Sequence, residues 1–372
     1  MERTTMELND YRLLGRSGLR VSPLCLGAMT FGDGGSGRNA DSAADSTAML
    51  ELYAEAGGNF IDAANIYNYG RAEEIVGDFI AGDRANFVVA SKYSMGMVEG
   101  QPNSGGNHRK NMMESVASSL QRLGTDYLDL FWVHIWDFRT PVEEVMRGLD
   151  DLVRQGRVHY VAISNAPAWK VAQANAVAEQ RGWTPFIAYQ GEHSLIDRSV
   201  DREIRPMCFE LGLTLMPWSP LAGGLLTGKY TDDDMGPPDP AAMKTGARKA
   251  QLQATGAINE RNLEIVTVVR RIAEATDATL SQVALAWLLA RSGRPLPVVG
   301  ARTVEQLKDN LGCLDVALSA EQIAELDEVS AIELGYPHRL YTSTMLRNFL
   351  VDRQSKVEAG FDVYDTALTR AR

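Results

Sequence analysis

A helix-to-strand unit that repeats along the chain limits the possible folds most strongly. In segments such as "LQRLGTDYLDLFWVH", "LVRQGRVHYVAIS" and "FELGLTLMPW", an amphipathic stretch ends at a Gly, and a run of β-branched and aromatic residues follows. Gly accepts the left-handed backbone at a helix C-terminus, and a run that is apolar on both faces is typical of a parallel strand covered by helices. The repeat therefore predicts parallel β/α units.

Eight such strand cores can be counted, and a helical pattern follows each of them. They are Pro23–Ala28, Asn59–Ala63, Phe87–Ser91, Tyr127–Val133, Val158–Ile163, Phe186–Tyr189, Leu213–Pro217 and Leu296–Val299. Eight units with no Pro/Gly/Ser-rich linker between them favour a closed (β/α)8 TIM barrel of the α/β class over an open sheet. We predict a single domain over residues 1–372, with the barrel at about 20–329.

Three segments lie outside this rhythm. The stretch "YRLLGRSGLRVS" predicts a β-hairpin before the barrel, with its turn at Arg16, Ser17 and Gly18. The stretch "TDDDMGPPDPAAMKTGARKAQ" predicts a long mobile loop after strand seven, of the kind that often forms a lid. The C-terminal tail, residues 330–372, has no strand pattern and is expected to pack around the barrel mouth.

The composition argues against a general affinity for polyanions. The chain has a formal net charge of −11 and a pI near 5.1, so we expect no binding to nucleic acid or to an anionic membrane. Cys25, Cys208 and Cys313 lie far apart, which predicts reduced thiols and neither a disulfide framework nor a metal site.

The N-terminus "MERTTMELND" lacks an apolar h-region, and the longest apolar run, "VALAWLLA", is eight residues. A cytoplasmic protein is expected.

Polar side chains stand at the ends of three predicted strands. Asp62 ends the second strand and Tyr67 follows it, Lys92 ends the third, and His134 ends the fourth. Each has an ordinary structural explanation by itself: a turn-forming Asp, a half-buried Tyr, a surface Lys, a hydrogen-bonded core His. Ionisable groups at the ends of buried strands are, however, seldom left without partners. Because the C-terminal ends of barrel strands carry the chemistry in this fold, we expect the four groups to converge.

Together these residues predict an acid for the reduction of a carbonyl group. Asp62 would hold the Lys92 ammonium, and Lys92 would lower the pKa of Tyr67 from its ordinary value of about 10. Tyr67 would then donate a proton to a forming alkoxide, and His134 would hydrogen-bond the same oxygen.

The sequence resembles the aldo-keto reductase superfamily, in its branch of aryl-alcohol dehydrogenases and potassium-channel β-subunits. The motifs that carry the resemblance, over roughly residues 14–329, are "NFIDAANIYNYGRAEEIVG", "ASKY", H-x-W-D, "AISNAPAW", "YQ" and "PWSPLAGGLLTGKY". The resemblance implies a catalytic tetrad of Asp62, Tyr67, Lys92 and His134. It also implies NADPH-dependent reduction of aldehydes and ketones, with NADPH preferred over NADH.

The resemblance also implies a set of cofactor-binding residues. Ser164, Asn165 and Gln190 would bind the nicotinamide carboxamide, and Trp218 would stack on the nicotinamide ring. The segment "SPLAGGLLTGK" would cover the pyrophosphate. The complete set for the nicotinamide and pyrophosphate is Ala28, Met29, Asp62, Ser164, Asn165, Gln190, Trp218, Ser219, Leu221, Gly223 and Lys229.

After strand eight, "VVGARTVEQLKDN" opens a helix. Thr303 and Gln306 fit a T-x-x-Q capping box, which is a sufficient structural reason for both residues. The alternative is an anion site in which the helix N-terminus and Arg302 receive the adenosine 2′-phosphate. By resemblance, Gly300, Gln306 and Asn310 complete the adenine end. The best-known family pattern has Lys-Ser where Gly300-Ala301 stand, so the NADPH preference depends mainly on Arg302.

Aromatic and apolar residues after the strands are candidates for the substrate pocket. They are Met29, Phe31, Tyr93, Trp136 and Trp169, and for each of them simple packing is the alternative. An aromatic lining would suit an apolar, aryl or polycyclic carbonyl compound.

The sequence argues against three rival interpretations. The stretch "GDGGSG", Gly32 to Gly37, matches the dinucleotide-binding fingerprint, but Arg38 to Asp41 separate its last Gly from the next predicted helix. The chain also contains no Tyr-x-x-x-Lys, which argues against a short-chain reductase. The third rival is a non-catalytic, cofactor-binding sensor of the potassium-channel β-subunit type. Those proteins carry Asn where this chain has His134, so the complete tetrad favours an enzyme.

Overall fold

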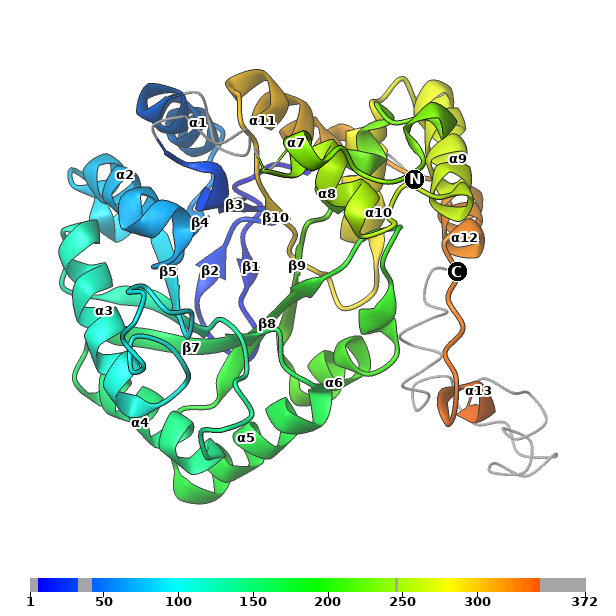
Figure 1. The fold of residues 1–372 in the computed structure, drawn as a ribbon. Coiled ribbons are helices and arrows are strands. Elements are labelled where there is room, and N and C mark those ends of the chain that lie inside the picture. Colours follow the sequence, from blue (N-terminus) through cyan, green and yellow to red (C-terminus); the bar gives the residue numbers. More distant parts are fainter. Residues whose placement is uncertain (1–5, 33–41, 245–246, 342–372) are drawn as a thin grey trace.

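The computed structural model describes residues 6–32, 42–244 and 247–341, and it contains the predicted barrel (Figure 1). Eight parallel strands form one sheet in the order β10-β3-β4-β5-β6-β7-β8-β9. Their bounds are β3 Cys25–Gly27, β4 Phe60–Asp62, β5 Val88–Tyr93, β6 Leu128–Val133, β7 Val158–Ser164, β8 Phe186–Glu192, β9 Thr214–Trp218 and β10 Val298–Val299. The Leu296 amide donates to the Leu215 carbonyl at 2.9 Å, which joins β9 to the segment before β10 and closes the barrel. The prediction of a (β/α)8 fold is confirmed.

The barrel interior is filled by one side chain in two along each strand. The hydrophobic cluster inside the barrel contains at least one residue of each of the eight strands, including Phe60, Ala90 and Trp132. The alternate residues, such as Ile61 and Val89, belong to a second cluster that packs against the surrounding helices. This two-faced burial explains why the strands are apolar throughout.

Helices follow the strands around the barrel. They are α1 Ala43–Glu55, α2 Arg71–Ile80, α3 Arg109–Leu123, α4 Val142–Arg154, α5 Ala168–Arg181, α6 Ile204–Leu211, α9 Glu260–Thr276, α10 Leu280–Ala290 and α11 Val304–Leu311, with α12 Ala320–Val329 and α13 His338–Tyr341 after the barrel. Gly124 and Gly212 cap α3 and α6 with φ values of 59° and 66°, as the repeated helix-Gly-strand pattern predicts. None of the described helices combines the length and apolarity needed to cross a membrane.

The predicted hairpin closes the N-terminal end of the barrel. Strands β1 Arg12–Leu13 and β2 Arg20–Val21 pair antiparallel, and the turn between them includes Arg16, Ser17 and Gly18. Leu14 and Val21 are fully buried and belong to the same cluster as the barrel interior. The hairpin therefore acts as an apolar plug beneath the strands.

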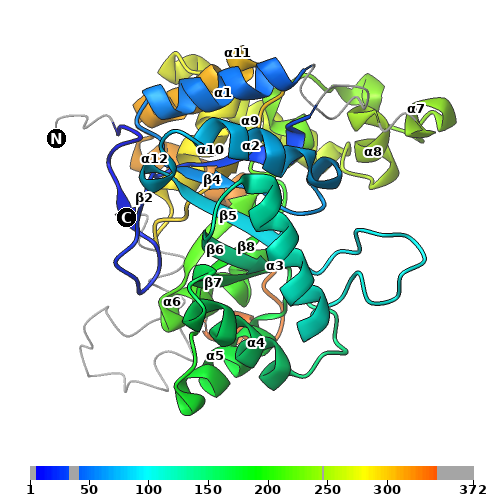
Figure 2. The same ribbon diagram turned by 90° about the vertical axis from the view of Figure 1, so that its left-hand side faces the viewer.

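The long segment after β9 contains more regular structure than its composition suggests. It includes α7 Pro240–Lys244, which begins at a Pro, and α8 Arg248–Ala254. Figure 2 shows α7, α8 and the loop between β5 and α3 projecting from the end of the barrel opposite the hairpin. The "GDGGSG" stretch from residue 33 onward and the tail from residue 342 lie outside the described residues.

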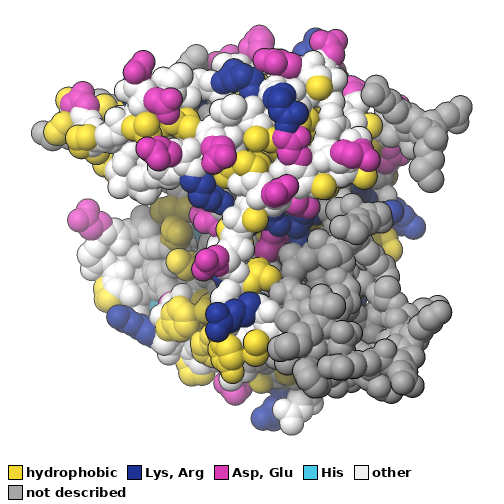
Figure 3. All heavy atoms as spheres, turned by 90° about the vertical axis from the view of Figure 1, so that its right-hand side faces the viewer, with side chains coloured by type: hydrophobic (Ala, Val, Ile, Leu, Met, Phe, Trp, Pro, Cys, Tyr) yellow, Lys and Arg dark blue, Asp and Glu magenta, His cyan; other side chains and the backbone are white. Residues whose placement is uncertain are grey.

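Charges of both signs are mixed on the surface that carries α9 and α12. Figure 3 shows acidic and basic side chains interspersed over this face, with no basic field on it. Such a surface offers no electrostatic reason for binding a polyanion there.

Candidate active site

The polar residues at the strand ends face the barrel axis because strands alternate with a period of two. Phe60, Ala90 and Trp132 belong to the barrel interior, so the residues two positions later, Asp62, Lys92 and His134, point the same way. The same register places Ser164 after Ala162, Gln190 after Ala188 and Trp218 after Met216. Six inward-facing polar or aromatic side chains therefore form a layer above the apolar interior.

Lys92 is the centre of this layer. Its side chain is fully buried, and its Nζ donates to Asp62 Oδ2 at 2.5 Å, to the Ala63 carbonyl at 2.9 Å and to Tyr67 Oη at 3.0 Å. These contacts use all three donors of an ammonium group. Burial lowers the pKa of Lys92, but Asp62 and Tyr67 together raise it above its ordinary value. The site therefore favours the charged form of Lys92.

Asp62 connects Lys92 to the opposite side of the barrel. Its Oδ2 also accepts from Gln190 Nε2 at 3.1 Å, while its buried Oδ1 has no hydrogen-bond partner within the described residues. A buried carboxylate oxygen without a partner is costly in a finished core and is typical of a site that receives a ligand or water.

Tyr67 reaches Lys92 from a strained loop. It begins the 3-10 turn Tyr67–Gly70 after β4, in which Asn68 and Tyr69 have φ values of 49° and 54°. Asn68 Nδ2 donates to the Phe31 carbonyl at 2.8 Å and so fixes this loop to the one after β3. Left-handed non-Gly residues of this kind accumulate at functional sites.

The protonation of Tyr67 differs from the prediction that its pKa is lowered. Burial raises the pKa of Tyr67 more than the neighbouring Lys92 lowers it, and Asp62 adds to the rise. The direction of the Lys92 effect agrees with the prediction, but the net direction does not. The sequence identifies the cation beside the phenol and cannot weigh it against the loss of solvent.

His134 is neutral and lies against Tyr67. Burial and the nearby Lys92 cation lower its pKa to about 3. Its ring is 5.9 Å from the Tyr67 ring in an edge-to-face arrangement. Its backbone amide donates to the Tyr93 carbonyl at 3.0 Å and to Ser94 Oγ at 3.2 Å, and its buried Nδ1 lacks a partner in the described part of the chain.

Two residues that support His134 were not found from the sequence. Ser94 follows β5 with a φ of 112°, and Asn107 is fully buried. Asn107 Nδ2 donates to Ser94 Oγ at 2.9 Å and to the Ile135 carbonyl at 2.8 Å, and its backbone amide donates to Asp137 Oδ2 at 2.7 Å. Asn107 thus joins the loops after β5 and β6. No local pattern around "GGNHRK" indicates this, because the partners are distant in sequence.

Asn165 organises the opposite wall of the site. It has a left-handed φ of 50°, and its Nδ2 donates to the His134 carbonyl and to Ser164 Oγ, both at 2.9 Å. Its Oδ1 accepts from Trp218 Nε1 at 3.2 Å. Asn165 therefore fixes the position of Trp218 and leaves the Ser164 hydroxyl proton available for another acceptor.

A group of cations surrounds the glycine-containing loop after β9. Burial lowers the pKa of Lys229, and Arg302 and Arg248 lower it further, so the three charges lie close enough to repel one another. Gly223 and Gly224 have φ values of 64° and 90°. A Cβ at Gly224 would lie 3.1 Å from Lys229 Nζ, so a larger residue there would crowd this cation. Arg248, on α8, was not identified from the sequence. The residues beside it in the chain do not indicate that α8 folds back over this loop.

The start of α11 forms half of the predicted capping box. Thr303 Oγ1 accepts from the Gln306 amide at 3.2 Å, but Gln306 Oε1 accepts from the Arg302 amide at 3.0 Å and not from that of Thr303. Gln306 therefore fixes the backbone that carries Arg302. Asn310 Nδ2 donates to the Gly300 carbonyl at 3.4 Å, which places the four residues of the proposed adenine end on one turn and helix.

A model of the aldo/keto reductase family matches residues 23–331, most of the chain. The chain belongs to this family. It is 38% identical over 364 residues to a norsolorinic acid reductase from Aspergillus flavus, covering 94% of this chain and 88% of the relative. It is 38% identical over 341 residues to an aryl-alcohol dehydrogenase [NADP(+)] from Phanerodontia chrysosporium, covering 87% and 86%. A putative aryl-alcohol dehydrogenase from Saccharomyces cerevisiae is 33% identical over 348 residues and covers 90% of each chain.

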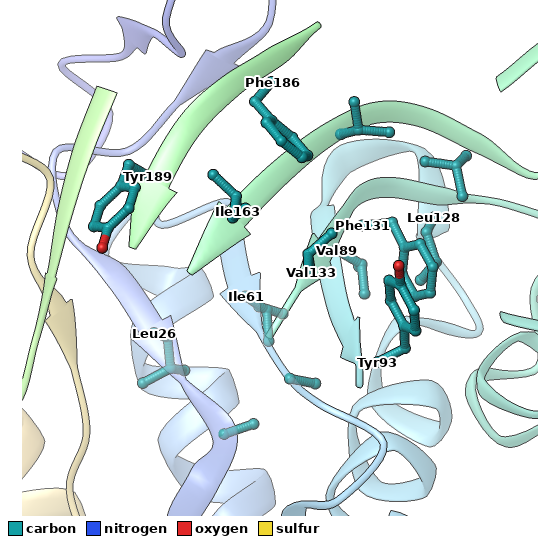
Figure 4. Packing of buried hydrophobic residues seen from close by; sticks show 14 of the residues in the cluster. Leu26, Ile61, Val89, Tyr93, Leu128, Phe131, Val133, Ile163, Phe186 and Tyr189 are labelled. Atoms are coloured by element: carbon teal, nitrogen blue, oxygen red, sulfur yellow. The ribbon is translucent and has the colours of Figure 1, made fainter. Parts of the chain in front are cut away.

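Two of the expected pocket residues of this aldo/keto reductase are core residues in the structure. Tyr93 is fully buried, stacks on Phe131 with ring centroids 5.2 Å apart, and donates to the Asn107 carbonyl at 3.2 Å (Figure 4). Because Lys92 points into the barrel, Tyr93 must point outward to the helices. Phe31 is likewise fully buried, in the same outer cluster. Neither side chain is exposed to a substrate here.

Other apolar side chains are exposed around the mouth of the reductase site. Met29 is 49% exposed and Trp169 is 61% exposed, as pocket residues can be, while Trp136 is buried beside them. Lys170 Nζ lies 4.4 Å from the Trp169 ring and 5.5 Å from the Trp136 ring. The sequence did not indicate three further exposed side chains in loops after β4 and β6, which are Tyr69, Ile135 and Phe138.

The structure predicts that His134 does not titrate near neutral pH. With a folded pKa of about 3 against about 6.5 in the unfolded chain, His134 contributes stability above pH 6.5 that is lost as the pH falls toward 3. Histidine-selective NMR between pH 8 and pH 5 should show an unchanged, neutral His134 ring, assigned by its disappearance in His134→Asn. A midpoint between pH 6 and 7 would contradict this electrostatic environment.

Proposed function

We propose that this protein is an NADPH-dependent reductase that converts apolar aldehydes and ketones to alcohols, with Tyr67 as the proton donor. The observation that carries the proposal is the 3.0 Å contact between Tyr67 Oη and the buried Lys92 ammonium. It joins a proton donor to a fixed positive charge at the end of the barrel where this fold carries its chemistry.

Each member of the tetrad has a defined task in this proposal. Bound NADPH would supply the hydride that reduces the carbonyl carbon. Tyr67 would give its phenolic proton to the carbonyl oxygen, and the adjacent Lys92 ammonium would stabilise the phenolate that remains. Asp62 keeps Lys92 charged and in place. His134, being neutral, can donate a hydrogen bond to the same oxygen without competing as an acid.

The raised pKa of Tyr67 affects which protonation state of the phenol the site favours. Reduction needs a protonated phenol, whereas alcohol oxidation needs a phenolate to accept the proton. Burial raises the pKa of Tyr67, so the folded site favours the protonated phenol that reduction uses.

The residues present suit a dinucleotide with a 2′-phosphate. Lys229, Arg248 and Arg302 lie close to one another beside the glycine-containing loop, and together they would neutralise the charge of the cofactor phosphates. Ser164 can donate to a carboxamide oxygen, while Asn165 Oδ1 and the Gln190 carbonyl oxygen can accept from its NH2. Trp218 would lie against the nicotinamide ring. Ala28, Met29, Ser219, Leu221 and Gly223 would line the cofactor, and Gly300, Gln306 and Asn310 would hold its adenine end.

The exposed apolar mouth supports a bulky aromatic or polycyclic substrate. Met29, Tyr69 and Phe138 lie in segments after three different strands, and Trp169 lies in the first turn of α5. Exposed apolar groups of this kind are typical of ligand sites. The names of the relatives point to aryl alcohols and to norsolorinic acid. We also infer a cytoplasmic enzyme, since the three cysteines are buried free thiols and NADPH is an intracellular reductant.

Replacing Tyr67 by Phe tests the proposed chemistry. Tyr67→Phe should lower the turnover of aromatic aldehydes by about 10²–10⁴ because the general acid is lost, while NADPH binding should stay nearly unchanged. Turnover is followed by NADPH absorbance and binding by quenching of tryptophan fluorescence. Tyr336→Phe, the same change at an exposed side chain outside the barrel, is the control and should keep its activity. Wild-type turnover in Tyr67→Phe would overturn the assignment.

The same assay separates an enzyme from a cofactor-binding sensor. A sensor would bind NADPH but would not oxidise it with any member of a panel of aromatic aldehydes and ketones. Steady NADPH consumption by the wild-type protein supports the reductase.

Cofactor choice tests the role of Arg302. Arg302→Ala should weaken NADPH binding roughly 10–100-fold and leave NADH almost unchanged, because only a 2′-phosphate uses both the guanidinium and the helix N-terminus. Lys308→Ala, which removes a cation from the same helix, is the control. An equal loss for both cofactors would show that Arg302 does not recognise the 2′ position.

A further inference from the structure

A cavity lies at the end of the barrel opposite the tetrad. It has a volume of about 550 Å³ and is bounded by the hairpin, the end of α6, the start of β9 and the turn before β10. A volume of this size is typical of small-molecule sites. It is far from the residues of the proposed reductase chemistry.

Four arginines line this cavity, and no acidic side chain of the described residues does. They are Arg12, Arg16, Arg205 and Arg294. Two of them have structural roles: Arg16 donates to the Glu210 carbonyl at 3.2 Å and covers Gly212, and Arg205 pairs with Asp201 at 3.4 Å. The chain has a net charge of −11, so a cationic cavity is not a consequence of composition.

Arg12 and Arg294 have no comparable structural role. Burial lowers the pKa of Arg12, and Arg294 lowers it further, against a smaller opposing effect of Asp10. Arg294 holds a left-handed φ of 50° and makes no side-chain hydrogen bond or ion pair within the described residues. Arg12 and Arg294 both line the cavity, and their like charges favour an anion between them.

Unused donors in the cavity walls point to the same kind of ligand. Arg205 is only 5% exposed and keeps a buried Nε with no partner in the described chain, although its other nitrogens bond Asp201 and Ser292. Arg12 Nη1 is also buried and lacks a partner among these residues, while its Nη2 contacts only the Met6 sulfur at 3.1 Å. Buried guanidinium donors are normally satisfied.

Much of the remaining cavity wall is apolar. Tyr11, Leu13 and Phe209 are 47%, 59% and 51% exposed, and Leu213 and Leu296 form part of the buried wall. Large exposed apolar side chains that cluster around one cavity are typical of a binding site.

We propose that this cavity binds a small aromatic carboxylate, with the carboxylate between Arg12 and Arg294 and the ring against Leu13 and Phe209. The site is independent of the proposed reductase function, because its residues lie at the opposite end of the barrel. An apolar body explains the aromatic and leucine walls, and a single negative charge explains the paired arginines.

Titration of the full-length protein with 4-fluorobenzoate, followed by ¹⁹F NMR in the presence of saturating NADPH, tests the proposal. Saturable binding should weaken by roughly tenfold or more in Arg12→Met and in Arg294→Met, since each removes a charge-assisted contact. Arg20→Met removes the same charge from an exposed position on the same hairpin and should bind like the wild type. The neutral 4-fluorobenzamide should bind at least tenfold more weakly than the carboxylate.

Several results would overturn the site. These are the absence of saturable binding, equal binding of 4-fluorobenzamide, equal binding of inorganic phosphate, or affinity that Arg12→Met and Arg294→Met both retain. Thermal unfolding of each variant establishes that it folds, and Arg294 is an exposed residue whose replacement should leave the core intact. Reductase activity should be unchanged in Arg12→Met and Arg294→Met. A failure of the cavity proposal can therefore be distinguished from a failure of the proposed reductase function.

Discussion

The buried ammonium of Lys92 is the constraint on which the active site depends. A full charge at the centre of a barrel is tolerated only if every donor is satisfied and an opposite charge is adjacent. Asp62, the Ala63 carbonyl and Tyr67 Oη meet this requirement, and each comes from β4 or from the loop that follows it. Satisfying Lys92 therefore fixes the position of Tyr67, the proton donor of the proposed reaction.

The strand register determines which residues could be predicted from the sequence. Asp62, Lys92 and His134 were predicted from their position at strand ends, and Ser164, Gln190 and Trp218 from the family resemblance. In the structure all six continue the inward face of apolar strands. The alternation of side chains along β5 places Tyr93, the residue after inward-facing Lys92, on the outer face of the barrel. The helix-Gly-strand rhythm also predicted the eight strands and the barrel, because both signals are local in the chain.

Features that arise from long-range contacts could not be predicted. Arg248 joins Lys229 and Arg302 only because α8 folds back over the glycine loop, and Asn107 supports His134 only because two loops meet. The net pKa of Tyr67 depends on how completely the folded chain excludes water, which no motif encodes. The arginine-lined cavity likewise forms where the hairpin, α6 and the turn before β10 come together.

The central claim is that Lys92 acts on catalysis through the pKa of Tyr67. The most direct test is the pH dependence of kcat/KM for aldehyde reduction in Lys92→Met beside the wild type. Loss of the cation should lower the rate and move the high-pH limb, where the phenol loses its proton, to higher pH. A variant that remains active with an unchanged high-pH limb would contradict the coupling between Lys92 and Tyr67.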